Sequence, residues 1–206
     1  MNKFLIRFSD LFASLLGLIL LSPILICIAI WIKSDTPGPV IFRQKRVGFR
    51  GKDFELFKFR TMVMDADRKG LITVGSRDPR ITKAGFLLRK YKLDEFPQLW
   101  NVLKGEMSLV GPRPEVRKYV DLYTEEQKQV LMVKPGITDL ASVAFSHENE
   151  LLSKQANPDE YYIKVLVPEK IRLNRHFIEH PTWLNYIRII LKTLGGIFGS
   201  SDNRTN

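Results

Sequence analysis

The sequence contains very little cysteine and histidine: one Cys, at position 27, and three His among 206 residues. A disulfide scaffold and the Cys₂His₂ or Cys₄ zinc modules each need more than one cysteine, so these classes are excluded. Neither the G-x-x-x-x-G-K loop nor the G-x-G-x-x-G fingerprint occurs, which leaves the nucleotide-binding folds that use them unsupported. Acidic residues are also scarce, since 22 Asp and Glu stand against 32 Lys and Arg and leave a formal charge of +10.

Hydrophobic residues make up 45% of the chain and include 13 Phe, which excludes intrinsic disorder. A charge this positive normally accompanies a clearly negative mean hydropathy, yet the mean is −0.09. Apolar and basic residues are therefore segregated along the chain. The length indicates one compact domain with an additional element, and the basic excess indicates an anionic partner, either nucleic acid or membrane phosphates.

The longest apolar stretch covers residues 11–32 and carries no charged side chain. At about 1.5 Å of rise per residue, a helix of this length matches a hydrocarbon core of roughly 30 Å. A signal peptide is less favoured, because the stretch exceeds the usual apolar core of roughly 7–15 residues and no small-x-small cleavage site follows it. The sequence therefore predicts a membrane helix within residues 1–35 and a separate body over residues 36–206.

Two features of this helix bear on whether it crosses the membrane. Ser22 and Pro23 lie in its middle, where the proline removes a backbone donor and predicts a kink. Basic residues flank it on both sides, Lys3 and Arg7 before it and a cluster beginning at Lys33 after it. Positive flanks at both ends suit a re-entrant hairpin, but many spanning helices also contain proline, so both topologies remain open.

The body is predicted to be α+β and mainly helical. Residues 40–62 contain two Val/Phe-rich runs separated by Gly48 and Gly51, which predicts a β-hairpin with Lys58 and Arg60 on one face. Short helices are expected over residues 86–91, 96–103 and 119–133. Near the C-terminus an apolar stripe with basic flanks suits either a membrane interface or the core, and consists of Trp183, Ile187, Ile190, Leu191, Leu194 and Phe198.

Asp94 and Glu95 form the most unusual local feature, because the two carboxylates lie in a basic and apolar context. Pro97 is acceptable only in a helix's first turn, so the pair is expected near that helix's N-terminus, where anions are favoured. Adjacent carboxylates stay ionised together only beside a cation, and Mg²⁺ is commonly held by one or two carboxylates plus substrate phosphates. A nucleophile with a metal ligand and a solvated capping pair are the two interpretations.

Two further patterns have the residue types of a binding site. Arg113 lies between two prolines that restrict its backbone, so its guanidinium suits a phosphate or a nucleobase face, with a structural turn as the alternative. His176, Glu179 and His180 reproduce the H-x-x-E-H pattern. We reject a metal site there, because Pro181 ends the helix and only Asp202 remains downstream as an acidic ligand.

Several longer motifs follow one another in a family-specific order: residues 38–42, 58–62, 93–99, 101–105, 108–114 and 134–138. Together with Ser22 and Pro23, they resemble the monotopic phosphoglycosyl transferases, also called bacterial sugar transferases. The resemblance implies a re-entrant helix that holds a small catalytic domain, with a β-hairpin and interfacial amphipathic helices, on the cytoplasmic face of the bacterial inner membrane. Such enzymes transfer a sugar phosphate from a UDP-sugar to polyprenyl (undecaprenyl) phosphate, release UMP and begin a surface glycan.

Carried over residue by residue, the resemblance implies that Asp94 is the nucleophile that becomes bonded to the phosphosugar. Asp94 and Glu95 would hold Mg²⁺. The positions implied for binding the donor's diphosphate or uridine are Lys58, Arg60, Arg89 and Arg113, with Asp159 as a looser acidic match.

The chain departs from the resemblance at residues 139–145, where many members read Trp-Ala-Gln-Val-Asn-Gly. We expect sugar selection to depend partly on this segment, so glucose, galactose and N-acetylated amino sugars stay open. Membrane and polyprenyl phosphates account for the basic excess, so no nucleic-acid partner is expected. A non-catalytic membrane-anchored adaptor with a basic lipid-binding face is the alternative, and the oligomeric state stays open, with a homodimer as one option.

Overall fold

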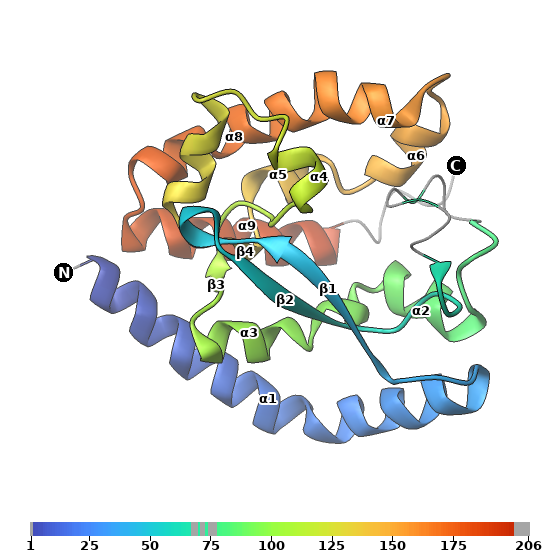
Figure 1. The fold of residues 1–206 in the computed structure, drawn as a ribbon. Helices are drawn as coiled ribbons and strands as arrows, with labels where there is room; N and C mark the ends of the chain where they lie inside the picture. Colours follow the sequence, from blue (N-terminus) through green and yellow to red (C-terminus); the bar gives the residue numbers. More distant parts are fainter. Residues whose placement is uncertain (1, 67–69, 71–72, 74–77, 200–206) are drawn as a thin grey trace.

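The computed structural model describes residues 2–66, 70, 73 and 78–199, with the side chains of residues 194 and 196–199 excepted. Within these residues the chain is mainly helical and has two small two-stranded sheets (Figure 1). The α+β, mainly helical class is therefore confirmed. The helices are α1 (Asn2–Asp35), α2 (Lys83–Lys90), α3 (Gln98–Lys104), α4 (Arg117–Val120), α5 (Leu140–Ala144), α6 (Glu148–Ser153), α7 (Pro158–Tyr161), α8 (Val167–Glu179) and α9 (Trp183–Gly199). The strands are β1 (Ile41–Val47), β2 (Asp53–Phe59), β3 (Ser108–Val110) and β4 (Gly136–Thr138).

The predicted apolar helix is present as α1, which extends beyond residues 11–32 in both directions and contains Pro23. Among the described residues, it is the one helix long and apolar enough to cross a membrane, by length and composition, and 11% of its most apolar window is buried. A helix in the core of a soluble protein would be largely covered, so this exposed apolar surface favours contact with lipid. Its ribbon curves along the lower side of the body (Figure 1).

Polar contacts hold the first half of α1 against the body. Asp10 is 2% exposed, and its carboxylate accepts hydrogen bonds of 2.9 Å from the Tyr186 hydroxyl of α9 and from the Leu109 backbone N–H of β3. Arg7 donates to the Val102 carbonyl at 2.7 Å, near the C-terminus of α3, where free carbonyls favour a cation. An apolar helix is thus joined to three separate elements by buried or half-buried polar groups.

The β-hairpin predicted within residues 40–62 is confirmed. β1 and β2 pair antiparallel from Ile41 opposite Phe59 to Val47 opposite Asp53. The connecting 3₁₀ turn (Phe49–Gly51) places Arg50 in the left-handed region, at φ 55°. This hairpin carries Lys58 from its second strand toward the centre of the molecule.

The helices predicted over residues 86–91 and 96–103 are confirmed as α2 and α3. The Thr82 side chain begins α2 by accepting a hydrogen bond from the Gly85 N–H at 3.0 Å. Gly85 is required by packing, because a Cβ there would lie 2.0 Å from the Thr61 carbonyl oxygen. On the next turn Leu88, 0% exposed, packs with Phe59 and the C-terminal half of α1.

β3 and β4 form a short parallel pair, with Ser108 opposite Gly136 and Val110 opposite Thr138. The backbone pairing continues past β3, since the Gly111 N–H donates to the Thr138 carbonyl at 3.0 Å. The segment that leads into Arg113 is therefore held at its start by β-type hydrogen bonds.

The helix predicted over residues 119–133 is wrong. The chain instead forms α4, an irregular link, and a 3₁₀ segment (Gln127–Met132). Thr124 and Gln127 explain the break: the Gln127 N–H donates to the Thr124 hydroxyl at 3.2 Å, and the Thr124 N–H donates to the Gln127 side chain at 2.9 Å. This reciprocal capping starts a new turn within the predicted helix.

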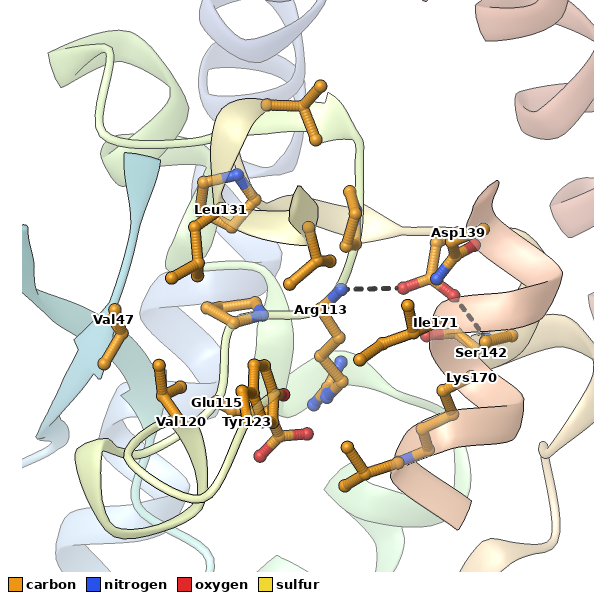
Figure 2. Close-up of a pocket in the computed structure, with 18 of the residues that line it drawn as sticks. Val47, Arg113, Glu115, Val120, Tyr123, Leu131, Asp139, Ser142, Lys170 and Ile171 are labelled. Atoms are coloured by element: carbon orange, nitrogen blue, oxygen red, sulfur yellow. Dashed lines mark hydrogen bonds between the residues drawn. The ribbon is translucent and has the colours of Figure 1, made fainter. Parts of the chain in front are cut away.

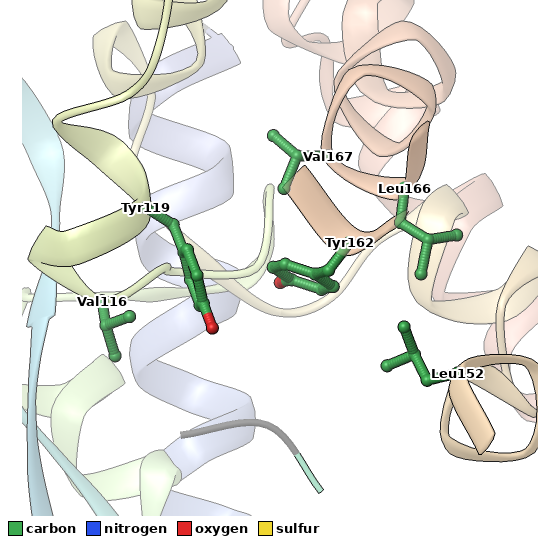
Figure 3. Packing of buried hydrophobic residues seen from close by; sticks show 6 residues of the cluster. All are labelled: Val116, Tyr119, Leu152, Tyr162, Leu166 and Val167. Atoms are coloured by element: carbon green, nitrogen blue, oxygen red, sulfur yellow. The ribbon is translucent and has the colours of Figure 1, made fainter. Parts of the chain in front are cut away.

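A hydrophobic cluster lies between α4, α6, the chain between α7 and α8, and the start of α8 (Figure 3), and is made of Val116, Tyr119, Leu152, Tyr162, Leu166 and Val167. Between α7 and α8 the helix passes through a π-helical segment, Tyr162–Leu166. Bulges of this kind redirect side chains and are frequent at functional sites. Here the segment carries Tyr162 into the cluster.

The C-terminal amphipathic helix is confirmed as α9, but its buried face differs from the predicted stripe. Tyr186 and Ile189 are buried, whereas Leu191 is 63% exposed. The predicted stripe members Leu194 and Phe198 lie outside the described side chains. α9 thus packs one face on the core, with Ile187 and Ile190 of the predicted stripe partly buried against it, and the membrane interface stays a prediction.

Candidate active site

A cleft of about 1680 Å³ lies at the centre of the molecule and collects the basic and acidic residues named above. Four separate elements supply them. Lys58 comes from β2, Arg89 from α2, Asp94 and Glu95 from the 3₁₀ turn Leu93–Glu95, and Arg113 from the segment after β3. Residues far apart in the sequence therefore converge on one cleft.

The carboxylate pair lies where the sequence predicted it, immediately before α3. Lys92 adopts the left-handed conformation, at φ 58°, and turns the chain from α2 into the 3₁₀ turn. Pro97 then precedes the first residue of α3. Asp94 is 6% exposed and lines the cleft, so the pair is not a solvated surface feature.

Glu95 is held by two cations. Lys58 Nζ lies 3.2 Å from Glu95 Oε1, and the Arg113 guanidinium donates to both carboxylate oxygens, one of them at 3.2 Å. Burial alone would raise the pKa of Glu95, but the Arg113 and Lys58 charges hold that pKa well below its usual value. Glu95 is therefore a fixed anion at neutral pH.

Asp94 differs from its neighbour in having an unengaged carboxylate. Within the described part of the chain, no hydrogen bond or ion pair within 4 Å reaches its oxygens. Burial raises the pKa of Asp94, and the Glu95 charge raises it further, while Lys58, Arg89 and Lys92 act in the opposite direction. A buried carboxylate with free lone pairs and cations nearby is suited to attack a phosphorus atom.

Lys58 is affected by the same environment. Burial lowers the pKa of Lys58 to about 8, and the Arg113 and Arg46 charges add to that effect, whereas the Glu95 charge opposes it. The ammonium is therefore charged at neutral pH but close to titration. Its Nζ is paired with Glu95, and its charge also acts on Asp94, so it can contact a phosphate placed beside the two carboxylates.

Arg113 is held rigidly, as its two flanking prolines predicted. Its backbone N–H donates to Asp139 Oδ2 at 2.8 Å, and Asp139 Oδ1 accepts from the Ser142 N–H at 2.6 Å, where it caps α5 (Figure 2). On the other side, the Arg46 guanidinium donates to the Pro114 carbonyl at 2.9 Å. The guanidinium of Arg113 is thus presented to the cleft from a fixed backbone.

Arg89 is positioned by hydroxyl groups. Its Nε donates to Thr61 Oγ1 at 3.0 Å and its Nη1 to Thr73 Oγ1 at 3.2 Å. These neutral acceptors orient the guanidinium without neutralising it. Arg89 therefore keeps a charge near Asp94 that a substrate phosphate can use.

Two of the expected binding residues are placed differently. Arg60 lines the cleft, but its guanidinium donates to backbone carbonyls after α1, including Thr36 at 2.7 Å, which fits a structural role at the C-terminus of that helix. Asp159, in the first turn of α7, accepts a hydrogen bond from the Tyr119 hydroxyl at 2.9 Å. Tyr119 lines the cleft, whereas Asp159 is not among the described residues that line it.

Asp139 and Thr61 were missed as positioning residues by the sequence reasoning. Asp139 could have been found as a helix N-cap, because it precedes Leu-Ala-Ser in a short helical pattern. Thr61 carries no such signal, since its role arises only when β2 and α2 come together. The structure thus adds a second layer of residues behind the predicted cations.

The carboxylate pair fits a divalent cation by its chemistry. Asp94 and Glu95 offer hard oxygen ligands, and the burial that raises the pKa of Asp94 would be offset by a nearby double positive charge. Among the described residues, no cluster of three or more His, Cys, Asp or Glu is available to enclose a metal. Mg²⁺ suits such an open site, because it keeps waters and substrate phosphates as its other ligands.

Comparison with known proteins identifies the family of the chain. The family described as bacterial sugar transferase matches residues 1–200. The chain is 39% identical over 166 residues to the UDP-N-acetylgalactosamine-undecaprenyl-phosphate N-acetylgalactosaminephosphotransferase of Aeromonas hydrophila, with 78% of this chain and 39% of that protein covered. It is 40% identical over 169 residues to the UDP-glucose:undecaprenyl-phosphate glucose-1-phosphate transferase of Escherichia coli K12, with 80% and 36% covered.

A third relative is the undecaprenyl-phosphate galactose phosphotransferase of Salmonella typhimurium, 38% identical over 179 residues, with 79% of this chain and 37% of that protein covered. The matches thus cover less than two fifths of the length of each of these three relatives. The family match, in contrast, extends over nearly the whole of this chain and includes every residue of the cleft described above. The chain therefore belongs to the bacterial sugar transferase family.

Proposed function

We propose that this protein transfers a sugar 1-phosphate from a UDP-sugar to undecaprenyl or a related polyprenyl phosphate, releases UMP, and so begins synthesis of a surface glycan. Family membership supports the reaction class, and the names of the relatives supply both substrates. The observation that carries the proposal is the contrast between the two carboxylates. Asp94 is buried and unengaged, whereas Glu95 beside it is held by Lys58 and Arg113.

In the first step, an Asp94 carboxylate oxygen attacks the β-phosphorus of the donor. A bond forms between that oxygen and phosphorus, the bond from phosphorus to the bridging oxygen breaks, and the bridging oxygen leaves on UMP. Negative charge grows on the leaving phosphate, where Lys58 and Arg113 can stabilise it. Arg89 orients the phosphoryl oxygens from the Asp94 side, and the product is an aspartyl phosphosugar.

In the second step, a phosphate oxygen of the polyprenyl acceptor attacks the same phosphorus. The bond to Asp94 breaks, the carboxylate is regenerated, and a polyprenyl diphosphate sugar is released. No net proton transfer is required in either step. The burial of Asp94 serves the reaction, because it restricts access of water to the intermediate.

Asp94 and Glu95 would hold Mg²⁺ together with the donor's phosphates. When bound, the ion supplies charge neutralisation at the diphosphate. The positions of Lys58, Arg89 and Arg113 are defined by this chain's own contacts, described above. We assign these three cations to the donor's diphosphate, and we retain neither Arg60 nor Asp159 as a direct ligand.

The direct test is to trap the covalent intermediate. The protein is incubated with a UDP-sugar and Mg²⁺ without polyprenyl phosphate, digested, and examined by mass spectrometry. We expect a sugar-phosphate adduct on Asp94 and stoichiometric UMP, and we expect neither with Asp94→Asn. Absence of any adduct from a protein that still turns over would refute the covalent route. Because the relatives named above act on different sugars, a panel of UDP-sugars is used.

We also propose that residues 1–35 enter one leaflet as a re-entrant helix, with Ser22 and Pro23 near the middle of α1, which stays helical through both residues and is not broken there, and that residues 36–206 lie on the cytoplasmic face of the bacterial inner membrane. The exposed apolar surface of α1 and its basic flanks support this arrangement. Asn2→Cys and Lys52→Cys, each in a Cys27→Ser background, are treated in intact cells with a membrane-impermeant thiol reagent. Both cysteines should be protected, and labelling of the first alone would indicate a spanning helix.

The alternative is a non-catalytic adaptor that binds anionic lipid through its basic face. The buried position of Asp94 speaks against it, because an adaptor has no need for an unengaged carboxylate in a cleft. Complementation separates the two functions. Asp94→Asn should abolish glycan synthesis in cells if the protein is an enzyme, and should leave it intact if the protein is an adaptor.

A further inference from the structure

The cleft does not end at Arg113 but continues away from Asp94. Contacts between charged side chains mark the direction: Lys58 and Arg113 meet Glu95, and the segment after Arg113 leads to Glu115. Among the described contacts Arg113 pairs with Glu95 and not with Asp94, and its backbone N–H donates to Asp139. The charges that act on Arg113 include Glu115, whereas those that act on Asp94 do not, so the lining near Glu115 belongs to the Arg113 side of the cleft.

We call this part the Phe145 arm and define it by six of its lining residues, Gln44, Glu115, Val143, Phe145, Asn149 and Lys170. They come from β1, the segment after Arg113, α5 and its C-terminal end, α6 and α8. Val143 and Phe145 are half-buried and give the arm an apolar and aromatic surface. The other four carry amide, carboxylate and ammonium groups.

A network of paired side chains fixes two residues of the Phe145 arm, Glu115 and Lys170. The Tyr162 hydroxyl donates to Glu115, and Glu115 lies 3.6 Å from Arg46. Lys170 lies over the Tyr162 ring, with Nζ 4.7 Å from its centroid, and pairs with Glu148 at 2.6 Å. Such a network is costly to bury unless every member has a partner, and once satisfied it holds its side chains in one arrangement.

Hydrogen bonds connect α5, which supplies Val143 to the Phe145 arm, to the backbone of Arg113. Asp139 binds the Arg113 backbone and caps α5, so the helix that presents Val143 and leads to Phe145 is fixed relative to Arg113. These residues belong to the segment 139–145, whose sequence departs from the pattern common in the family. Three residues of this segment, Ser142, Val143 and Phe145, line the cleft.

Phosphoryl transfer places the attacking and leaving oxygens roughly in line through phosphorus. With Asp94 on one side, the leaving nucleoside monophosphate must lie on the opposite side. Lys58 and Arg113 would hold the diphosphate, so the nucleoside extends past Arg113. A pyrimidine nucleoside requires a flat apolar surface for the base and hydrogen-bonding groups for the base edge and the ribose, which is the combination that the Phe145 arm offers.

We infer that the Phe145 arm binds the nucleoside of the donor and of the departing UMP, with the base against Phe145 and Val143. This inference rests on the proposed function for the direction of attack. It moves residues 139–145 from the expected role in sugar selection to a role in nucleoside recognition.

UMP binding tests the inference without requiring turnover, because UMP contains the nucleoside and lacks the sugar. Its dissociation constant is measured by calorimetry on the full-length protein in lipid nanodiscs with Mg²⁺. We expect Phe145→Ala to raise the constant about tenfold, through loss of aromatic contact, and Phe145→Tyr to leave it within about twofold. Asn149→Ala, at an exposed position that does not threaten folding, should raise it by about threefold.

Met64→Ala is the matched control, since Met64 is an exposed apolar residue that lines the cleft outside the Phe145 arm. It should leave UMP affinity unchanged. If Phe145→Ala and Asn149→Ala both bind UMP as the unmodified protein does, the inference is overturned. An altered preference among UDP-sugars in those same variants would then assign the arm to the sugar.

Failure of the proposed function and failure of this inference give different results. Failure of the unmodified protein to form the Asp94 adduct would refute the covalent route, yet UMP affinity would still report on the Phe145 arm. Conversely, if the unmodified protein is active but its Phe145→Ala and Asn149→Ala variants retain full UMP affinity, only the assignment of the nucleoside to the Phe145 arm is refuted.

Discussion

Replacement of Arg113 by alanine tests the centre of the proposed mechanism. The guanidinium donates to both oxygens of Glu95 and is expected to contact the diphosphate. Loss of one preorganised donor to a developing phosphate charge reduces catalysis about 100-fold, or about 2.7 kcal/mol. We therefore expect kcat/KM for UMP release to fall by about that factor with Arg113→Ala, and less with Arg113→Lys, which keeps the charge but not the two-pronged geometry.

The same change should affect stability only moderately. Removing one partner of a buried ion pair costs about 3–5 kcal/mol when the other charge is left alone. Glu95 is not left alone, because Lys58 remains 3.2 Å away, and the Arg113 side chain is 32% exposed. We therefore expect the free energy of unfolding to fall by about 1–2 kcal/mol, less than the full cost of an unpaired buried charge.

Arg117→Ala is the matched control. Arg117 follows Arg113 by four residues, its side chain is 46% exposed, and it pairs with Asp53 outside the cleft. Steady-state UMP release and denaturant unfolding are measured for both variants. If Arg113→Ala and Arg117→Ala reduce kcat/KM by the same factor within about twofold, the assignment of Arg113 to the diphosphate is refuted.

Four other outcomes are expected. Asp94→Asn should abolish adduct formation and raise the melting temperature. The pKa of Asp94 is raised in the folded state, so at a pH above the pKa of the unfolded state the ionised carboxylate destabilises the fold. The neutral amide of asparagine removes that cost. UMP release should decline as pH rises past about 8, where Lys58 loses its charge, and Lys58→Arg should remove this decline from the pH profile. Asp139→Ala should lower the free energy of unfolding by about 1–2 kcal/mol and raise KM for the donor, because α5 loses its cap and Arg113 its backbone partner. Chelation by EDTA should stop adduct formation and leave the circular dichroism spectrum unchanged, since the fold is held by contacts outside the carboxylate pair.

Local patterns predicted much of the fold. The uncharged stretch 11–32 became α1, the glycine-separated Val/Phe runs became the hairpin, and Pro97 placed the carboxylates just before α3. Each of these signals acts between near neighbours in the chain. The prediction over residues 119–133 was wrong because Thr124 and Gln127 cap one another, and an apolar period does not reveal such a pair.

In the candidate site, too, the sequence indicated which residues take part, and the structure showed how they are paired. The resemblance supplied Asp94, Glu95, Lys58, Arg89 and Arg113, and the structure brings these five to one cleft. It did not reveal that Glu95 alone is held by cations, or that Arg60 binds the end of α1. The functional difference between two adjacent carboxylates depends on which elements face each of them.

What the sequence alone determined is the set of chemical groups and their local conformations: an apolar helix, a rigid Arg113 between two prolines, and a carboxylate pair before a helix. These follow from side-chain chemistry and from backbone restrictions over a few residues. Only the tertiary structure decided which groups are buried, paired or free, because burial and charge pairing arise between segments distant in the chain. It left Asp94 unengaged and Glu95 doubly held, and it placed Ser142, Val143 and Phe145 along the wall of the cleft.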